Sequence, residues 1–219
     1  MRTKTEQEIE HRIWRSWVED GLPELVTGLG FFALAMVLWE RGHAVGVWAL
    51  ALQYLQVGVI LVLAFGARRL VQAAKWRVTY PRTGYVAYGR GGWRKREVWV
   101  AVAVGLVTVA GFAFVMAAES LSASASLMGL SAAMAAAFLY WAGRRGWERG
   151  FLYAVTAALA GPLAVMLSAG SVTARTFALQ GGVHFVLIGV AQMAGGAWAL
   201  FSYLRKYPLP LTPRRKSHE

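Results

Sequence analysis

Five polar side chains with helical spacing lie inside apolar blocks of this chain. His184 lies one turn after Gln180 and two turns before Gln192, so these three share one face of a helix. Gln53 and Gln56 lie three residues apart in an earlier block. Ionisable groups are costly within a membrane, which makes His184 a functional candidate, and the five side chains together could line a polar cavity for a small solute or a proton. The alternative is hydrogen bonding between packed helices, which we favour because a buried histidine is usually satisfied in this way.

The sequence holds no pattern that is typical of an enzyme. It lacks the His-Glu-x-x-His, Gly-x-Ser-x-Gly, Walker and Gly-x-Gly-x-x-Gly motifs and shows no facing pair of carboxylates at membrane depth. It has no cysteine, which excludes disulfides, thiolate metal sites and cysteine nucleophiles. We therefore predict no catalytic residue, no metal site and no cofactor. An intramembrane lipid-modifying enzyme is the remaining enzymatic alternative.

A basic and aromatic segment between the second and third apolar blocks is a second candidate site. Two short β-prone runs flank a Pro-Arg-Thr-Gly sequence, which predicts a small β-hairpin-like turn. Its charges suit an acidic partner, although basic residues there also hold the loop inside and rest on anionic lipid headgroups. Nucleic acid is not expected, because no recognition module surrounds the cluster. The candidate interaction residues are Trp76, Arg77, Tyr80, Pro81, Arg82, Gly84, Tyr85, Arg94, Lys95 and Arg96.

Long apolar blocks must position these residues. The chain has 57% hydrophobic and 16% charged residues over 219 positions, which is typical of a membrane protein rather than of a soluble domain. A helix needs about 20 apolar residues to cross a bilayer. The sequence therefore predicts an all-α membrane protein with six transmembrane helices in three hairpins, at 22–39, 44–65, 98–118, 127–142, 151–168 and 179–203.

These blocks divide the chain into alternating membrane and surface segments. Three transmembrane hairpins cover 22–66, 98–143 and 151–204. The segments between and around them are an amphipathic N-terminal segment, a basic loop, a short loop and a basic tail, at 1–21, 67–97, 144–150 and 205–219.

The distribution of basic residues predicts the orientation. Lys and Arg resist translocation, and 21 of the 23 lie in segments that would share a side with the N-terminus. Only Arg41 and Arg175 lie in the other turns. We therefore expect both termini and the basic loop in the cytoplasm.

The N-terminal segment has a pattern of its own. Ile9, Ile13 and Trp17 recur every four residues among charged ones, which predicts an amphipathic helix on the inner membrane surface. Asp20 is expected to cap the first span, because its carboxylate can accept a hydrogen bond from a free amide there.

Two further patterns concern helix shape and packing. Pro162 interrupts the fifth block near its middle and predicts a kink, because proline cannot donate the backbone hydrogen bond. Gly129, Ala133 and Ala137 recur every four positions in the fourth block and predict a face on which another helix approaches closely.

Three short motifs carry a resemblance. They are Glu-Asp-Gly at 19–21, Tyr-Pro-Arg-Thr-Gly-Tyr-Val at 80–86 and Tyr-Pro-Leu-Pro at 207–210. With them the chain resembles a group of uncharacterised bacterial integral membrane proteins that have an EDG-type start to the first span, a YPRTGYV-like inner loop and a basic YPLP-like exit. The resemblance implies a bacterial cytoplasmic membrane and brings no known activity.

Two functions fit these observations. The first is a non-enzymatic accessory or scaffold subunit that binds a membrane or cytoplasmic protein through its basic loop. The second is a small-solute or proton-linked transporter or channel, with the polar cluster as its site and Pro162 in its moving part. A homo-oligomer is compatible with either.

Overall fold

The structure is a computed structural model that describes residues 17–83, 123–167 and 174–208. This part of the chain is helical and contains no strand. The helices are α2 (Leu22–His43), α3 (Val47–Leu61), the π-helical η1 (Val62–Gly66), α4 (Ala67–Val78), α5 (Tyr80–Thr83), α7 (Ala123–Arg145), α8 (Glu148–Leu167) and α9 (Ala174–Lys206).

Several of these helices are suited to a membrane. Within the described residues, five helical stretches are long and apolar enough to cross one. Each overlaps an apolar block of the sequence, while the block at 98–118 and the amphipathic pattern that begins at Ile9 lie largely outside the described residues. The stretches are Leu22–His43, Val47–Val78, Ser124–Arg145, Glu148–Leu167 and Ala178–Lys206.

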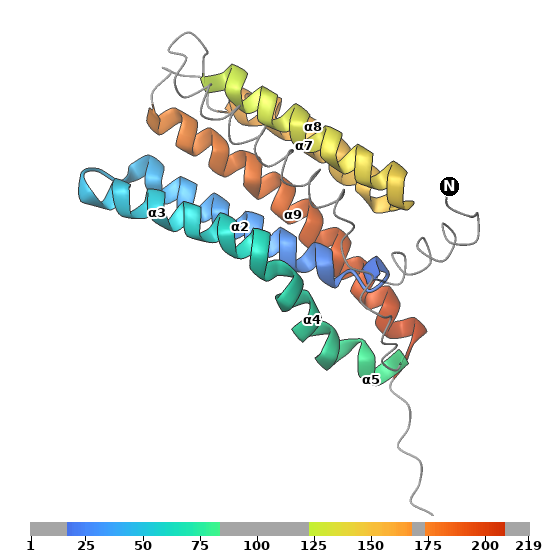
Figure 1. Cartoon of the computed structure of the whole chain (residues 1–219). Helices are drawn as coiled ribbons and strands as arrows, with labels where there is room; N and C mark the ends of the chain where they lie inside the picture. Colours follow the sequence, from blue (N-terminus) through green and yellow to red (C-terminus); the bar gives the residue numbers. More distant parts are fainter. Residues whose placement is uncertain (1–16, 84–122, 168–173, 209–219) are drawn as a thin grey trace, which may run out of the picture.

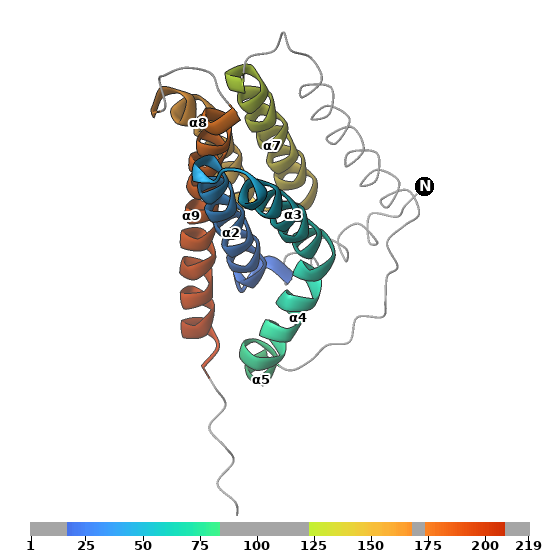
Figure 2. The same ribbon diagram turned by 90° about the vertical axis from the view of Figure 1, so that its left-hand side faces the viewer.

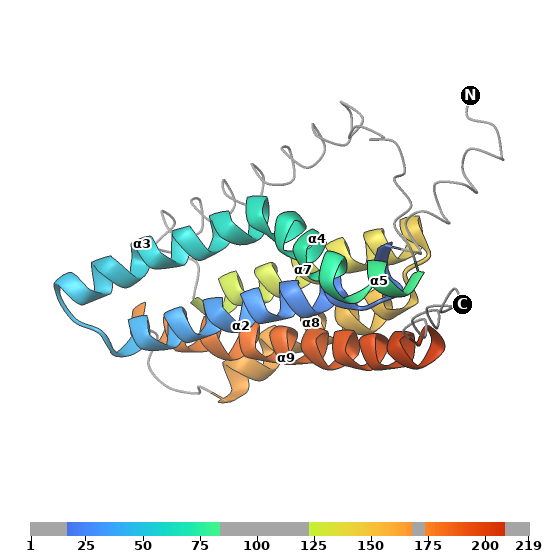
Figure 3. The same ribbon diagram turned by 90° about the horizontal axis from the view of Figure 1, so that it is seen from below.

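Helix α9 occupies the centre of the bundle. Figure 1 shows it between α2 on one side and the α7–α8 pair on the other, and Figure 2 shows α9 running beside α2. Helix α3 follows α2, and the chain changes direction at η1, where a π-helical turn accommodates an extra residue. Beyond η1, α4 and α5 return to the end of the bundle where α2 begins and α9 finishes (Figure 3).

The antiparallel pair of α2 and α9 is built on small residues. A Cβ atom added to Gly28 would lie 2.8 Å from the backbone nitrogen of Met193 and 2.9 Å from the carbonyl oxygen of Gly189. The pattern repeats every seven residues, or about two helical turns, so it stays on the facing sides of both helices. Its members are Gly21, Gly28 and Ala35 at α2 and Gly196, Gly189 and Gly182 on α9. The two backbones therefore touch along most of their common length.

The predicted contact face of the fourth block meets no other helix among the described residues. Gly129, Ala133 and Ala137 are exposed, and a Cβ atom at Gly129 would meet nothing within 4 Å. The packed face of α7 carries Leu127, Ser131, Ala135 and Ala142, most of which are small residues too. Small residues at helical spacing do not reveal which side of a helix has a neighbour.

Pro162 lies inside α8, which continues beyond it to Leu167. Its neighbour Gly161 explains the local packing, since a Cβ atom there would lie 2.8 Å from Cβ of Ser131 on α7. The predicted kink stays a prediction.

The prediction of a β-hairpin-like turn is wrong for its first half, residues 76–83, which is helical except at Thr79. Residues 76–78 belong to α4 and residues 80–83 form α5. Pro81 lies in the first turn of α5, where a backbone amide would have no hydrogen-bond partner within the helix, so the amide hydrogen that proline lacks is not missed. The carbonyl of Thr79 accepts hydrogen bonds from the backbone nitrogens of Arg82 at 3.0 Å and Thr83 at 3.2 Å. The second half of the turn, residues 84–88, lies outside the described residues.

We predict that Gly28→Ala destabilises the bundle, because the added methyl group meets backbone atoms that cannot move aside. Overpacking of this kind costs about 1–3 kcal/mol. Thermal unfolding in detergent would show it as a melting temperature several degrees lower. Gly129→Ala is the matched control and should leave the melting temperature unchanged or raise it. Equal behaviour of the two variants would contradict the close contact of α2 with α9.

Candidate functional site

A buried ion pair joins the start of α2 to α4. The carboxylate of Asp20 and the ammonium of Lys75 are in direct contact, with side-chain exposures of 0% and 2%. Asp20 also accepts hydrogen bonds from the hydroxyl of Thr79 at 2.8 Å and from the backbone nitrogen of Leu22 at 3.2 Å. The ammonium of Lys75 donates to the carbonyl of Trp17 at 2.9 Å and lies over its ring. Both charges are therefore paired and hydrogen-bonded, as burial requires.

A second buried carboxylate lies one turn further along α2. Oε1 of Glu24 pairs with Nη2 of Arg149 at 3.2 Å and accepts a hydrogen bond from the indole nitrogen of Trp147 at 3.1 Å. Arg149 also donates to the carbonyl of Val18 at 2.5 Å. The start of α8 is thereby tied to the start of α2. Oε2 of Glu24, Nη1 of Arg149 and the hydroxyl of Tyr153 are buried without a hydrogen-bond partner among the described residues.

The end of α9 joins the same region, which we call the Asp20 end. Lys206 pairs with Glu19 at 2.8 Å. Arg82 donates to the carbonyl of Tyr207 at 3.1 Å, and the hydroxyls of Thr83 and Tyr203 lie 3.1 Å apart. Three motifs carry the resemblance, and their described parts therefore meet at one end of the bundle. These parts are residues 19–21, 80–83 and 207–208.

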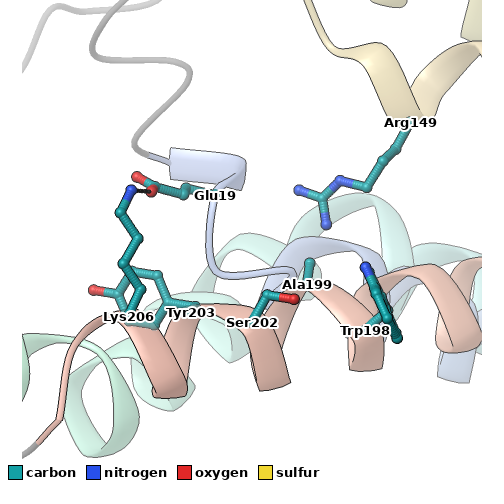
Figure 4. A pocket seen from close by; sticks show the side chains of 7 residues that line it. All are labelled: Glu19, Arg149, Trp198, Ala199, Ser202, Tyr203 and Lys206. Atoms are coloured by element: carbon teal, nitrogen blue, oxygen red, sulfur yellow. Dashed lines mark hydrogen bonds and ion pairs between the residues drawn. The ribbon is translucent and has the colours of Figure 1, made fainter.

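An open groove of about 250 Å³ lies at the Asp20 end. Figure 4 shows Arg149 reaching toward it from α8, while Lys206 and Glu19 close its other side. Its floor is one face of α9. The lining residues are Glu19, Arg149, Trp198, Ala199, Ser202, Tyr203 and Lys206.

The five polar residues predicted as an intramembrane cluster do not come together. Gln192 accepts a hydrogen bond from Thr27 of α2 at 2.7 Å, and His184 lies 3.1 Å from the hydroxyl of Ser131 of α7. Gln56 accepts one from Arg41 at 3.0 Å. Each of these bonds joins a different pair of helices.

The two remaining members differ in environment. Gln53 on α3 is exposed. Gln180 is buried on α9, and its Oε1 has no partner among the described residues. Thr27 and Ser131 were missed by sequence reasoning because hydroxyl groups are common in apolar helices and nothing in their spacing marks a partner.

The described members of the candidate interaction segment lie along α4 and α5. Trp76 is 58% exposed, Arg77 and Pro81 are exposed, and Tyr80 packs edge-on against the ring of Trp76. Arg82 is partly buried by its bond to Tyr207. Gly84, Tyr85, Arg94, Lys95 and Arg96 lie outside the described residues.

Sequence reasoning missed the charged residues of the Asp20 end as a group. Asp20 was expected only as a helix cap, but Gly21 is the N-cap residue of α2, and Asp20 precedes it and accepts a hydrogen bond from the amide of Leu22. Lys75 was counted among the loop cations and Glu24 received no role. The usable signal was a pair of carboxylates, Asp20 and Glu24, one turn apart at the start of an apolar block.

None of the known family models, curated proteins or solved structures matches this chain. No group of three or more metal-ligating side chains occurs in the part of the chain that the structure describes. The side chains of the Asp20 end can hold helices together and can donate hydrogen bonds to an anion.

We predict that Asp20→Asn destabilises the fold by about 3–5 kcal/mol, because it leaves the buried ammonium of Lys75 uncompensated. Adding Lys75→Met should recover most of this loss in thermal unfolding measurements. The control is Glu19→Ala, which removes a neighbouring carboxylate from an exposed pair and should cost less than about 1 kcal/mol. A double variant as unstable as the single one would contradict the proposed role of the pair.

Thr27→Val and Ser131→Ala should each cost about 0.6 kcal/mol if their bonds serve helix packing. Thr156→Val is the control, because its hydroxyl bonds only to the carbonyl of Leu152 within its own helix. Unfolding in a detergent–denaturant titration would measure all three. Losses no larger than the control's would show that these bonds do not hold the helices together.

Proposed function

We propose that this chain is a multi-pass protein of a bacterial cytoplasmic membrane that acts as an accessory or scaffold subunit, without enzymatic activity of its own. The observation that carries the proposal is the Asp20 end, where buried ion pairs fix a helix with exposed Trp and Arg side chains. Such side chains are enriched in protein interfaces. The fixed helix leads directly into the basic segment 84–96.

The charges of the described helices support the proposed orientation. The described basic residues of the predicted inner segments lie on α4, α5 or the helix termini that meet at the Asp20 end. Arg41, with Glu40 beside it, lies at the opposite end of α2. An Asp20 end that faces the cytoplasm agrees with the tendency of Lys and Arg to stay there.

The positions of the helix ends support a sixth span. Residue 83 lies at the Asp20 end, and so does the end of α7, because Trp147 bonds to Glu24. Helix α7 has 23 residues and a length of about 34 Å, so residue 123 lies at the opposite end. If α4 and α7 both finish on the inner side, residues 84–122 must cross the membrane once. The apolar block 98–118 is long enough for that crossing.

The proposed docking face is the exposed side of α4 and α5. Trp76, Arg77 and Pro81 are exposed there, and the ion pair of Lys75 holds this helix against α2 from its other side. A partner would therefore meet a rigid surface and lose little entropy on binding. A protein with acidic groups suits the positive charge.

The transporter proposal has less support. Gln192, His184 and Gln56 bond to separate partners on separate helices, as packing bonds do. The groove of about 250 Å³ lies at the end of the bundle and contains none of the five polar residues. We therefore keep the accessory subunit as the proposed function.

The test is native mass spectrometry of the protein tagged at its C-terminus and purified gently from its own membrane. We expect a stoichiometric protein partner, and we expect Trp76→Ala with Arg77→Ala to reduce its occupancy at least about tenfold, as for an interface hot spot. Both side chains are exposed, so the fold should survive the change.

The matched control is Trp141→Ala with Arg144→Ala, which removes the same residue types near the same end of the bundle from α7. It should retain the partner. Equal loss in both variants would indicate non-specific attraction to the basic end and would contradict the proposed face. A protein that carries only lipid would contradict the accessory role itself.

A further inference from the structure

The groove at the Asp20 end combines two cations with an apolar wall. Arg149 enters from the start of α8 and Lys206 stands at the last turn of α9 (Figure 4). Between them, the floor is formed by Ala199, Ser202 and Tyr203 of α9. Ser202 and Tyr203 lie three and four residues after Ala199, so all three share one side of the helix.

Both cations line the groove, and Lys206 has donors left for a ligand. Arg149 is held by Glu24 and by the carbonyl of Val18 through Nη2, and its Nη1 is buried, so Arg149 contributes positive charge to the groove. Lys206 is 62% exposed and its bond to Glu19 uses one of the three donors of an ammonium group. The exposed hydroxyl of Ser202 adds a further donor on the floor. An exposed ammonium, an exposed hydroxyl and the positive charge of Arg149 therefore surround one groove, and such groups favour a phosphate.

The apolar part of the groove continues away from this charged end. Trp198 is 73% exposed and lies two turns before Lys206 on α9. In a helix that crosses a bilayer, this places the ring on the membrane side of the charges, at the level where tryptophan is enriched. The groove thus presents cations at one end and an exposed aromatic surface toward the bilayer.

We infer that this groove binds one anionic phospholipid, with its phosphate between Arg149 and Lys206 and an acyl chain along Trp198. The inference rests on the chain spanning a membrane, but it does not depend on a protein partner. Basic pockets between membrane helices on the cytoplasmic side are typical sites for such headgroups.

Glu19 makes the inference sharply testable. Its carboxylate lines the groove and competes with the lipid phosphate for the ammonium of Lys206. Removal of Glu19 should therefore strengthen lipid binding, whereas removal of Lys206 should weaken it. A pair that served stability alone would give changes of the same sign for both.

The experiment is native mass spectrometry of the full-length protein with equal amounts of phosphatidylglycerol and phosphatidylcholine. We expect one phosphatidylglycerol to remain bound preferentially. Lys206→Gln should lower its retention about fivefold and Glu19→Gln should raise it, since one cation near a headgroup is worth about that factor. The control is Arg205→Gln, which removes the same charge from the residue before Lys206. Because Arg205 does not line the groove, this variant should change the retention of phosphatidylglycerol less than about twofold.

Four results would overturn the assignment. The first is equal retention of the two lipids by the unaltered protein, and the second is an effect of Arg205→Gln as large as that of Lys206→Gln. The third is displacement of the lipid by millimolar glycerol 3-phosphate, which would assign the groove to a soluble phosphate ester. A Glu19→Gln variant that loses lipid together with Lys206→Gln would show that the pair acts on the fold alone.

Discussion

The carboxylate of Asp20 is fully buried, and a buried charge must be paired before the helices around it can pack. Lys75 supplies the counter-charge from α4, while Thr79 and the amide of Leu22 occupy the remaining acceptor sites. Lys75 and Thr79 lie more than 50 residues from Asp20 in the chain. The ion pair therefore determines where α4 lies, and with it the direction in which the following segment leaves the bundle.

The contact between α2 and α9 sets the distances that the ion pairs require. Glycines at positions 28 and 189 allow the two backbones to touch. This close approach brings the end of α9 beside Glu19, so that Lys206 can pair with it. Glu24 then fixes α8 through Arg149 and Trp147. Backbone contact in the middle and charge pairing at one end thus reinforce each other.

The polar bonds within the apolar region have a different role. Thr27 with Gln192 and Ser131 with His184 each join α9 to a different neighbour. In an apolar surrounding such bonds specify which helix faces align, at a modest energy for each. The proposed functions accordingly concern the Asp20 end, where exposed cations and aromatic rings lie beside the buried pairs.

Composition and block length determined that the described chain is all-helical, with stretches able to cross a membrane, because a bilayer of fixed thickness imposes that length on any apolar helix. The distribution of Lys and Arg likewise predicted that the described basic segments share one end, since charge is local to each segment. The sequence could not show that Gly28 touches α9 while Gly129 meets no described helix, because both are small residues. Nor could it pair Asp20 with Lys75 or separate His184 from Gln56. Those relations depend on how the helices are rotated and which of them are neighbours, and only the tertiary packing decides that.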